Sequence, residues 1–302
     1  MVSEQEASEA FPSVSERLLA LSPPVIGRCL HLAALALADC AQATPRLEAE
    51  LLLAEASGLR RTELYARPEA GLTPDQFARF AALLQRRLVG EPLAYLLGRW
   101  GFWTLELEVT PATLIPRPET ELLVETALER LTPDRPLRIA DLGTGSGAIA
   151  AALASERPLW HLIAVERSPA AMAIARDNFR RLGLLVAPVL GHWLSALGPD
   201  CLDAILSNPP YVAAGDPHLA GSLRFEPQLA LVSGQDGLDA IRAILADAPR
   251  CLKSGGLLAV EHGYDQGATV RRLFAQGGLQ DIETRCDLAG HERITLGYRA
   301  GQ

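Results

Sequence analysis

A glycine-rich segment lies between an apolar run and an apolar helical pattern near the middle of the chain. It reads Asp-Leu-Gly-Thr-Gly-Ser-Gly over residues 141–147. In a doubly wound sheet, a strand-to-helix turn of this kind binds a nucleotide-like ligand, and glycines let the backbone approach it closely. A carboxylate at the strand end would repel a pyrophosphate and attract a sulfonium, which favours S-adenosylmethionine over NAD. The residues expected to bind the cofactor are Asp141, Gly143, Thr144, Gly145, Ser146 and Gly147.

A second acid, Glu166, follows the next apolar run, Leu162–Val165. Its two oxygens can accept hydrogen bonds from both ribose hydroxyls of an adenosine ligand. Taken alone, the glycine segment is also compatible with a plain tight turn, and Glu166 with a solvated charge. Together they occupy the expected places of one β-α-β unit that binds adenosine.

The most specific feature is Asn208-Pro209-Pro210-Tyr211, which follows the apolar run Ala204–Leu206. Each proline fixes its own φ and pushes the preceding residue toward extended geometry, so the loop is rigid. The Asn208 side-chain oxygen and a proline carbonyl can accept both hydrogens of a planar –NH2 group, while Tyr211 offers a face for stacking. We expect Asn208, Pro209 and Tyr211 to be catalytic and the whole loop to bind substrate; a merely rigid turn is the alternative.

These features predict methyl transfer from a sulfonium to an amide or amine nitrogen. The reaction is an in-line displacement, so alignment and electrostatic matching matter more than covalent catalysis. The chain shows no metal-ligand spacing, and its five scattered cysteines, Cys29, Cys40, Cys201, Cys251 and Cys286, are expected to be reduced thiols. No metal is predicted.

The surrounding sequence divides into a helical part, a hairpin and an α/β part. Residues 1–97 are helical in character, with about 1–21 as an extension; Thr44 and Thr73 are each followed by proline and are expected to cap helices. Residues 98–116 show period-two apolar positions, which predict a β-hairpin linker. From residue 117 to 302, apolar runs alternate with helical patterns, and Ser168 before Pro169 repeats the capping signal. This alternation predicts a mostly parallel sheet with helices on both faces.

Composition narrows the class of function. With 302 residues and 49% hydrophobic residues the chain can build a packed core, and a net charge of −8 disfavours a nucleic-acid substrate. The acidic start lacks the features of a secretion signal, and the early apolar run is shorter than a membrane span. We therefore expect a cytoplasmic protein without a membrane segment, and a monomer.

Several motifs resemble those of the peptide chain release factor N5-glutamine methyltransferase family, often called PrmC or HemK. Besides the two segments above, they are Gly90–Tyr95, Leu114–Glu121, Arg224–Pro227, Gly234–Asp239, Tyr264–Gln266 and Asp287–Gly290. The resemblance implies a Rossmann-like class I methyltransferase domain with a small helical N-terminal domain. It also implies S-adenosyl-L-methionine as cofactor and, as substrate, the glutamine of the Gly-Gly-Gln motif in class 1 release factors.

Carried over by motif, the family's cofactor positions include Trp193, expected beside the adenine, and Asn208. The chain departs from the family at His192, where an acid is usual, so a contact from that acid to the adenine amino group is not expected here. Gly101 likewise replaces a commonly acidic residue. Methylation of a ribosomal-protein glutamine, DNA adenine-N6 methylation after base flipping and a non-catalytic cofactor-binding scaffold are the alternatives.

Overall fold

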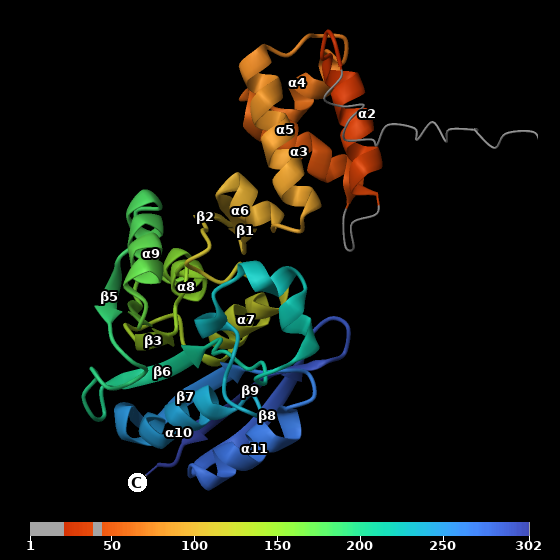
Figure 1. Cartoon of the computed structure of the whole chain (residues 1–302). Coiled ribbons are helices and arrows are strands. Elements are labelled where there is room, and N and C mark those ends of the chain that lie inside the picture. The colour runs from red at the N-terminus through yellow and green to blue at the C-terminus, as the bar shows by residue number, and fades with distance from the viewer. Residues whose placement is uncertain (1–20, 39–43, 302) are drawn as a thin grey trace, which may run out of the picture. The chain divides into compact units, whose positions relative to one another are not determined.

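The computed structural model describes residues 21–38 and 44–301. The chain divides into two compact units, Met1–Leu97 and Gly98–Gln302, each described below by itself. Figure 1 shows that the described residues of the first unit form helices, whereas the second unit has a sheet with helices. Within the described residues, no helix is long and apolar enough to cross a membrane.

The described residues of the first unit, 21–38 and 44–97, form five helices around one apolar core. The helices are α2 (Ile26–Leu37), α3 (Pro45–Ser57), α4 (Arg61–Ala66), α5 (Pro74–Leu88) and α6 (Leu93–Leu97). Buried leucines and alanines from these helices pack around the fully buried Phe80. The predicted cap at Thr73 is present, because its hydroxyl accepts from the Gln76 N–H at 3.2 Å. Thr44 is the N-cap of α3 with Pro45 at the first helical position, as predicted, but its hydroxyl makes no cap bond; its N–H donates to the Glu48 carboxylate.

The second unit begins with the expected hairpin. Strands β1 (Arg99–Phe102) and β2 (Leu105–Glu108) pair antiparallel, and Phe102 and Leu107 are buried. Their side chains belong to the same apolar cluster as the helices of one sheet face. The period-two pattern in this segment therefore marks a hairpin that packs on the catalytic unit.

A seven-stranded sheet forms the centre of the second unit, with strand order β5-β4-β3-β6-β7-β9-β8. Five strands are parallel, and β9 runs antiparallel to both of its neighbours. The strands are β3 (Arg138–Leu142), β4 (His161–Glu166), β5 (Val186–Leu190), β6 (Leu202–Ser207), β7 (Leu252–Glu261), β8 (Leu279–Cys286) and β9 (Glu292–Arg299). The predicted, mostly parallel α/β sheet is confirmed.

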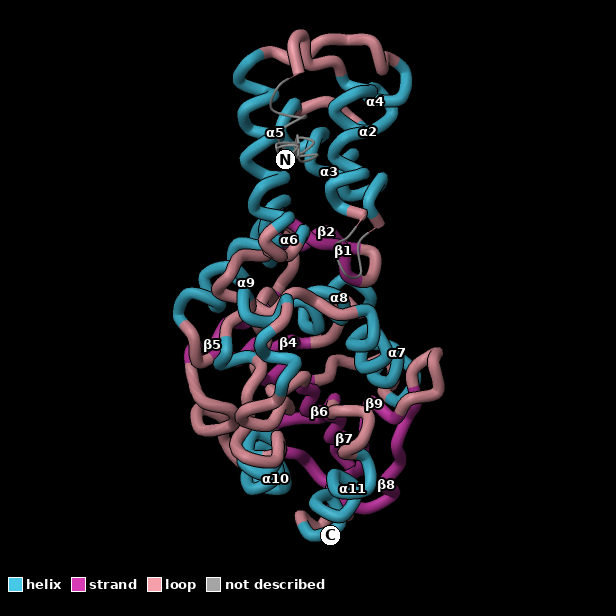
Figure 2. Tube along the Cα trace, turned by 45° about the vertical axis from the view of Figure 1, so that its right-hand side comes forward, coloured by secondary structure: helices cyan, strands magenta, loops and turns pink. Residues whose placement is uncertain are grey.

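Helices cover both faces of this sheet, as Figure 2 shows in a second view. Successive residues of β3 belong to the apolar clusters on opposite faces of the sheet. Ile139 packs in the cluster with α7 (Glu121–Arg130), α8 (Ala148–Glu156) and α9 (Pro169–Arg181). Ala140 packs with α10 (Asp239–Cys251) and α11 (Gly267–Gln276). Because neighbouring strand residues face opposite sides, a strand covered on both sides reads as a continuous apolar run.

One buried side chain joins the hairpin to the sheet's helices. Asn178 on α9 is 0% exposed, and its Oδ1 atom accepts from the Glu108 N–H at 2.7 Å. Its Nδ2 atom donates to the carbonyls of Glu108 at 3.0 Å and Ser146 at 2.9 Å. Asn178 thus connects β2, α9 and the glycine-rich segment.

We predict that Asn178→Ala lowers the free energy of unfolding by about 2–4 kcal/mol, because it leaves several buried backbone groups unpaired. The neighbouring Asp177→Ala is the matched control, since Asp177 is half exposed and pairs with the exposed Arg180. That change should stay within about 0.5 kcal/mol of the parent. Urea denaturation measures both, and equal losses would contradict this role for Asn178.

Candidate active site

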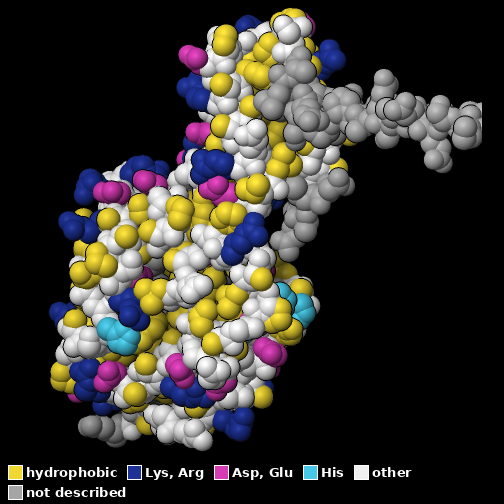
Figure 3. All heavy atoms as spheres, viewed as in Figure 1, with side chains coloured by type: hydrophobic (Ala, Val, Ile, Leu, Met, Phe, Trp, Pro, Cys, Tyr) yellow, Lys and Arg dark blue, Asp and Glu magenta, His cyan; other side chains and the backbone are white. Residues whose placement is uncertain are grey.

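The candidate site lies at the edge of the sheet where the parallel strands end. A cavity of about 380 Å³ opens there, within the size range of small-molecule sites. Six of the predicted site residues line it: Gly143, Gly145, Glu166, Trp193, Asn208 and Pro210. On the face seen in Figure 3, hydrophobic side chains gather over the middle of the larger unit, with most charged ones around them.

Three glycines of the segment after β3 have left-handed backbones, with φ of 72° at Gly143, 58° at Gly145 and 88° at Gly147. A Cβ atom on Gly143 would lie 3.3 Å from the Trp193 ring, and one on Gly147 would lie 2.6 Å from the Phe179 ring. Gly143 therefore keeps the cavity wall open, whereas Gly147 lets the start of α8 pack against α9.

Asp141 lies beneath this segment and not in the cavity wall. It is 0% exposed, and its Oδ2 atom accepts from the Thr144 hydroxyl at 2.5 Å and the Ala150 N–H at 3.2 Å. Burial raises the pKa of Asp141 to about 6. The carboxylate thus ties the glycine segment to the first turn of α8. Thr144, Ser146 and Gly147 are also absent from the described lining of the cavity.

Glu166 ends β4 and lines the cavity, as the sequence predicts. Its Oε2 atom accepts from the Gly145 N–H at 3.1 Å, and its Oε1 atom accepts from the Ser168 N–H at 2.8 Å. A carboxylate has about four lone-pair sites, so both oxygens can still accept from ligand hydroxyls. Glu166 therefore shapes the glycine segment and presents acceptors to the cavity. Ser168 also caps α9, as predicted, by accepting from the Ala171 N–H.

The Asn208–Tyr211 loop follows β6 and contacts two residues that the sequence did not mark as catalytic. Asn208 Nδ2 donates to the Thr120 hydroxyl at 2.9 Å, and that hydroxyl donates to Glu261 at 2.7 Å. The Tyr211 hydroxyl lies 3.4 Å from the other Glu261 oxygen. The phenol therefore points into the protein, and burial raises the pKa of Tyr211.

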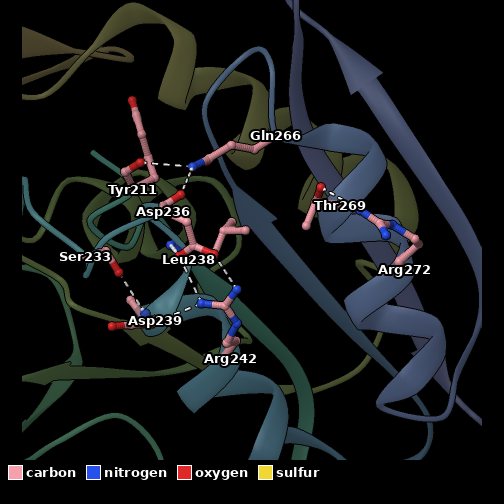
Figure 4. A network of polar contacts seen from close by, with 10 residues as sticks. Tyr211, Ser233, Asp236, Leu238, Asp239, Arg242, Gln266, Thr269 and Arg272 are labelled. Carbon is pink, nitrogen blue, oxygen red and sulfur yellow. Dashed lines mark hydrogen bonds and ion pairs between the residues drawn. The ribbon is translucent and has the colours of Figure 1, made fainter. Parts of the chain in front are cut away.

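A second network holds the backbone of the same loop, as Figure 4 shows. Gln266 Nε2 donates to the Tyr211 carbonyl at 3.1 Å and to the Asp236 carbonyl at 3.2 Å. Gly237 has φ of 76°, and a Cβ atom there would lie 2.2 Å from the Tyr211 carbonyl oxygen. Residues of the Gly234–Asp239 and Tyr264–Gln266 motifs therefore support the backbone of this loop, and Gly234 and Asp239 also line the cavity.

An ion pair between a buried glutamate and a partly exposed arginine joins two further motifs. Glu226, 5% exposed, pairs with Arg117 and accepts from the Ile115 N–H at 3.0 Å. The segment after Tyr211 is thereby fixed to the segment that leads into α7. Pro227 and Leu229, which follow Glu226, line the cavity.

Trp193 and His192 both line the cavity, and their rings lie 5.6 Å apart at 51°. Trp193 has φ of 47°, which is uncommon for a bulky residue and holds its ring against Gly143. Its predicted place in the cofactor site agrees with this geometry, although the adenine contact stays a prediction. The cavity is also lined by residues that were not predicted to bind cofactor or substrate, among them Arg167, Ser168, Leu229, Ser233, Asp239 and Ala240.

The residues present fit S-adenosylmethionine. Glycines leave the wall open beside an aromatic ring, and Glu166 offers acceptors for hydroxyls at the edge of the same cavity. Asn208 lines the same cavity. Within the described residues, no cluster of three His, Cys, Asp or Glu side chains could hold a metal ion.

Two family models match the chain in the order that this architecture requires. One is described as the PrmC N-terminal domain and matches residues 28–98. The other is described as a methyltransferase small domain and matches residues 118–225, which include the glycine segment, Glu166 and the Asn208–Tyr211 loop.

Curated relatives match over most of their length. The release factor glutamine methyltransferase of Pseudomonas aeruginosa is 53% identical over 257 residues, covering 84% of this chain and 93% of its own. The Escherichia coli protein of the same name is 49% identical, covering 85% and 93%. Among solved structures, a methyltransferase from Pyrococcus furiosus is 18% identical with a TM-score of 0.50, covering 72% of this chain and 97% of its own. That likeness concerns the fold.

We predict that Gly237→Ala is more harmful than its backbone angle alone explains. Gly278 has φ of 77° and open space around it, so Gly278→Ala is the matched control. The control should cost about 1–2 kcal/mol for the left-handed conformation. Gly237→Ala should cost roughly 1–3 kcal/mol more, because the Tyr211 carbonyl must move. Chemical denaturation compares them, and equal costs would show that this contact relaxes freely.

Proposed function

The chain belongs to the release factor glutamine methyltransferase family, and from this premise we propose its reaction. It transfers a methyl group from S-adenosylmethionine to the side-chain amide nitrogen, N5, of the glutamine in the Gly-Gly-Gln motif of class 1 release factors. The observation that carries the proposal is the rigid Asn208 loop, which stands in the wall of the same cavity as Gly143 and Glu166.

When bound, S-adenosylmethionine supplies an electrophilic methyl group on a sulfonium. The glutamine nitrogen is a poor nucleophile, since its lone pair is delocalised into the carbonyl. We propose that Asn208 Oδ1 and the Pro209 carbonyl accept the two N–H groups of the amide and orient the nitrogen. As positive charge develops on nitrogen, these acceptors bind it more strongly, which lowers the barrier.

The proton balance requires no dedicated base. The nitrogen gains a carbon and loses one hydrogen, and a methylated amide nitrogen with positive charge is acidic enough to release its proton to water. The residues proposed to act are therefore positioning acceptors. Gly143, Gly145, Glu166 and Trp193 are proposed to bind the cofactor, with Asp141 and Thr144 holding the glycine segment in shape.

We propose that the enzyme acts in the cytoplasm as a monomer on a protein partner and not on nucleic acid. The net charge of −8 supports this choice over a DNA adenine methyltransferase, which would have to neutralise many phosphates. The helical first unit is proposed to recognise the folded release factor.

Mass spectrometry tests the substrate directly. After incubation with the enzyme and S-adenosylmethionine, a class 1 release factor should carry one added methyl group, located on the Gly-Gly-Gln glutamine. Asn208→Ala should slow this turnover on the order of 100-fold, as expected when one oriented polar group is lost. Methylation of duplex DNA with release factors left untouched would overturn the proposal.

Glu166→Ala tests the cofactor site. We predict a loss of about 1.5–3 kcal/mol in S-adenosylmethionine affinity, the usual contribution of hydrogen bonds to a charged group. The exposed Glu125→Ala on α7 changes the net charge equally and is the matched control, since Glu125 does not line the cavity. Isothermal titration gives both affinities, and an unchanged value in folded Glu166→Ala would remove Glu166 from the site.

A further inference from the structure

We propose that Thr120 and Glu261 are positioning residues: through a directional hydrogen-bond relay, they fix which end of the Asn208 amide faces the substrate. The inference rests on the proposed function and adds to it the reason why the Asn208 oxygen, and not its nitrogen, is presented. The relay joins three elements that are distant in sequence, the 3-10 turn Pro118–Thr120, the end of β6 and the end of β7.

The relay is buried and closely spaced. Glu261 is 1% exposed and Thr120 is 4% exposed. The Thr120 hydroxyl lies 2.7 Å from Glu261 Oε2 and 2.9 Å from Asn208 Nδ2. Water is therefore a poor competitor for these groups, and each must be satisfied by its protein partner.

The direction of the relay follows from counting protons. An ionised carboxylate can only accept hydrogen bonds, and a threonine hydroxyl has one proton to donate. Thr120 must therefore donate to Glu261, which leaves a lone pair of its oxygen facing Asn208. Only the –NH2 end of the Asn208 amide can satisfy that lone pair, because the reversed amide would place two acceptor oxygens against each other.

The relay determines which atom of the Asn208 side chain is presented to the cavity. With Nδ2 held by Thr120, the Oδ1 atom of Asn208 points to the other side. Within residues 21–38 and 44–301 this oxygen accepts no protein hydrogen bond, and Asn208 lines the cavity. A free, fixed acceptor is what the –NH2 group of a glutamine substrate requires. The reversed amide would present a donor to a donor and repel the substrate nitrogen.

The same carboxylate also holds the far end of the loop. The Tyr211 hydroxyl donates to Glu261 Oε1 across a longer 3.4 Å. Glu261 Oε2 therefore accepts from Thr120, which in turn binds Asn208, and Oε1 accepts from Tyr211, so that both ends of the Asn208–Tyr211 loop are linked to this carboxylate. Burial disfavours the charged form of a carboxylate, so a buried carboxylate without such hydrogen bonds would destabilise the fold.

The charge on Glu261 makes the relay sensitive to pH. Burial raises the pKa of Glu261 to about 7; the hydrogen bond from Thr120 and Arg293 on β9 oppose this rise, nearby Glu119 adds to it, and Tyr211 is the other group in contact. A protonated Glu261 can donate to the Thr120 oxygen, so that the Thr120 proton turns to Asn208 and favours the reversed amide. The kcat should therefore be highest at pH values above the pKa of Glu261 in the folded protein, and should fall as the pH drops through about 7.

The first test separates orientation from folding. Thr120→Val keeps the shape but removes the hydroxyl, Thr120→Ser restores it, and Thr126→Val removes another buried hydroxyl on α7 away from the cavity. Thr120→Val should lose roughly 10- to 100-fold in kcat on a release factor, with KM and cofactor affinity changed much less. Thr120→Ser should recover most of the loss, and Thr126→Val should keep the parent kcat. Equal kcat in Thr120→Val and the parent would overturn the relay.

The pH profile of kcat is the second measurement. Glu261→Gln keeps an acceptor oxygen for Thr120 but cannot titrate, so its kcat should lack the fall below about pH 7 seen in the parent. Its turnover near pH 8 should be reduced, because the neutral amide can itself face either way. The same acid limb in Glu261→Gln and the parent would assign the titration to another group and contradict the proposal.

A measurement that needs no turnover separates this proposal from the proposed function. The side-chain 15N–1H signals of Asn208, identified by their absence in Asn208→Asp, should shift with a midpoint near the Glu261 pKa of about 7 in the parent, and not in Thr120→Val. If release factors are not methylated but these signals behave as stated, the relay stands and the substrate assignment fails. If the signals do not respond to pH in the parent, the relay is wrong whatever the substrate.

Discussion

The carboxyl ends of parallel strands all reach the same edge of a sheet, and this constraint gathers the site. Strands β4, β3, β6 and β7 lie side by side in the sheet, in that order. The residues at or just after their ends are the glycine segment, Glu166, Asn208 and Glu261. Residues more than a hundred positions apart in the chain therefore come together without any contact specified between them locally. The helices on both faces keep the strands dry and in register.

The loop that follows β6 is rigid for two separate reasons. Its prolines restrict the backbone from within, as the sequence alone indicates. From outside, Gln266 binds the Tyr211 carbonyl, and Gly237 leaves room for that carbonyl at a spacing that no side chain would permit. Rigidity in this loop matters because an acceptor helps a developing charge most when it does not have to reorganise.

Three buried acidic side chains lie at this edge of the sheet, and each accepts hydrogen bonds from two protein donors. Asp141 accepts from a hydroxyl and a backbone N–H, Glu166 from two backbone N–H groups, and Glu261 from two hydroxyls. Asp141 and Glu166 shape the glycine segment, whereas Glu261 acts on the substrate loop. The sequence shows the first two because they flank a recognisable motif. Glu261 ends a strand in the same way, so the strand-end position was the signal that could have identified it.

The sequence by itself determined the class of fold, the cofactor chemistry and the position of the loop that we propose binds the substrate amide, because these depend on periodicity and on short motifs. Hydrophobic alternation located the strands, and glycine and proline marked the two functional turns. The sequence did not determine that Asp141 lies below the cavity wall or that the Tyr211 hydroxyl points inward. Nor did it determine that Thr120 and Glu261 contact the Asn208 loop. Those facts depend on side-chain direction and on pairs such as Asn208 and Thr120, which are 88 residues apart. Only the packed sheet brings such pairs within hydrogen-bond distance, so the tertiary structure alone decided which polar groups line the cavity and which support them.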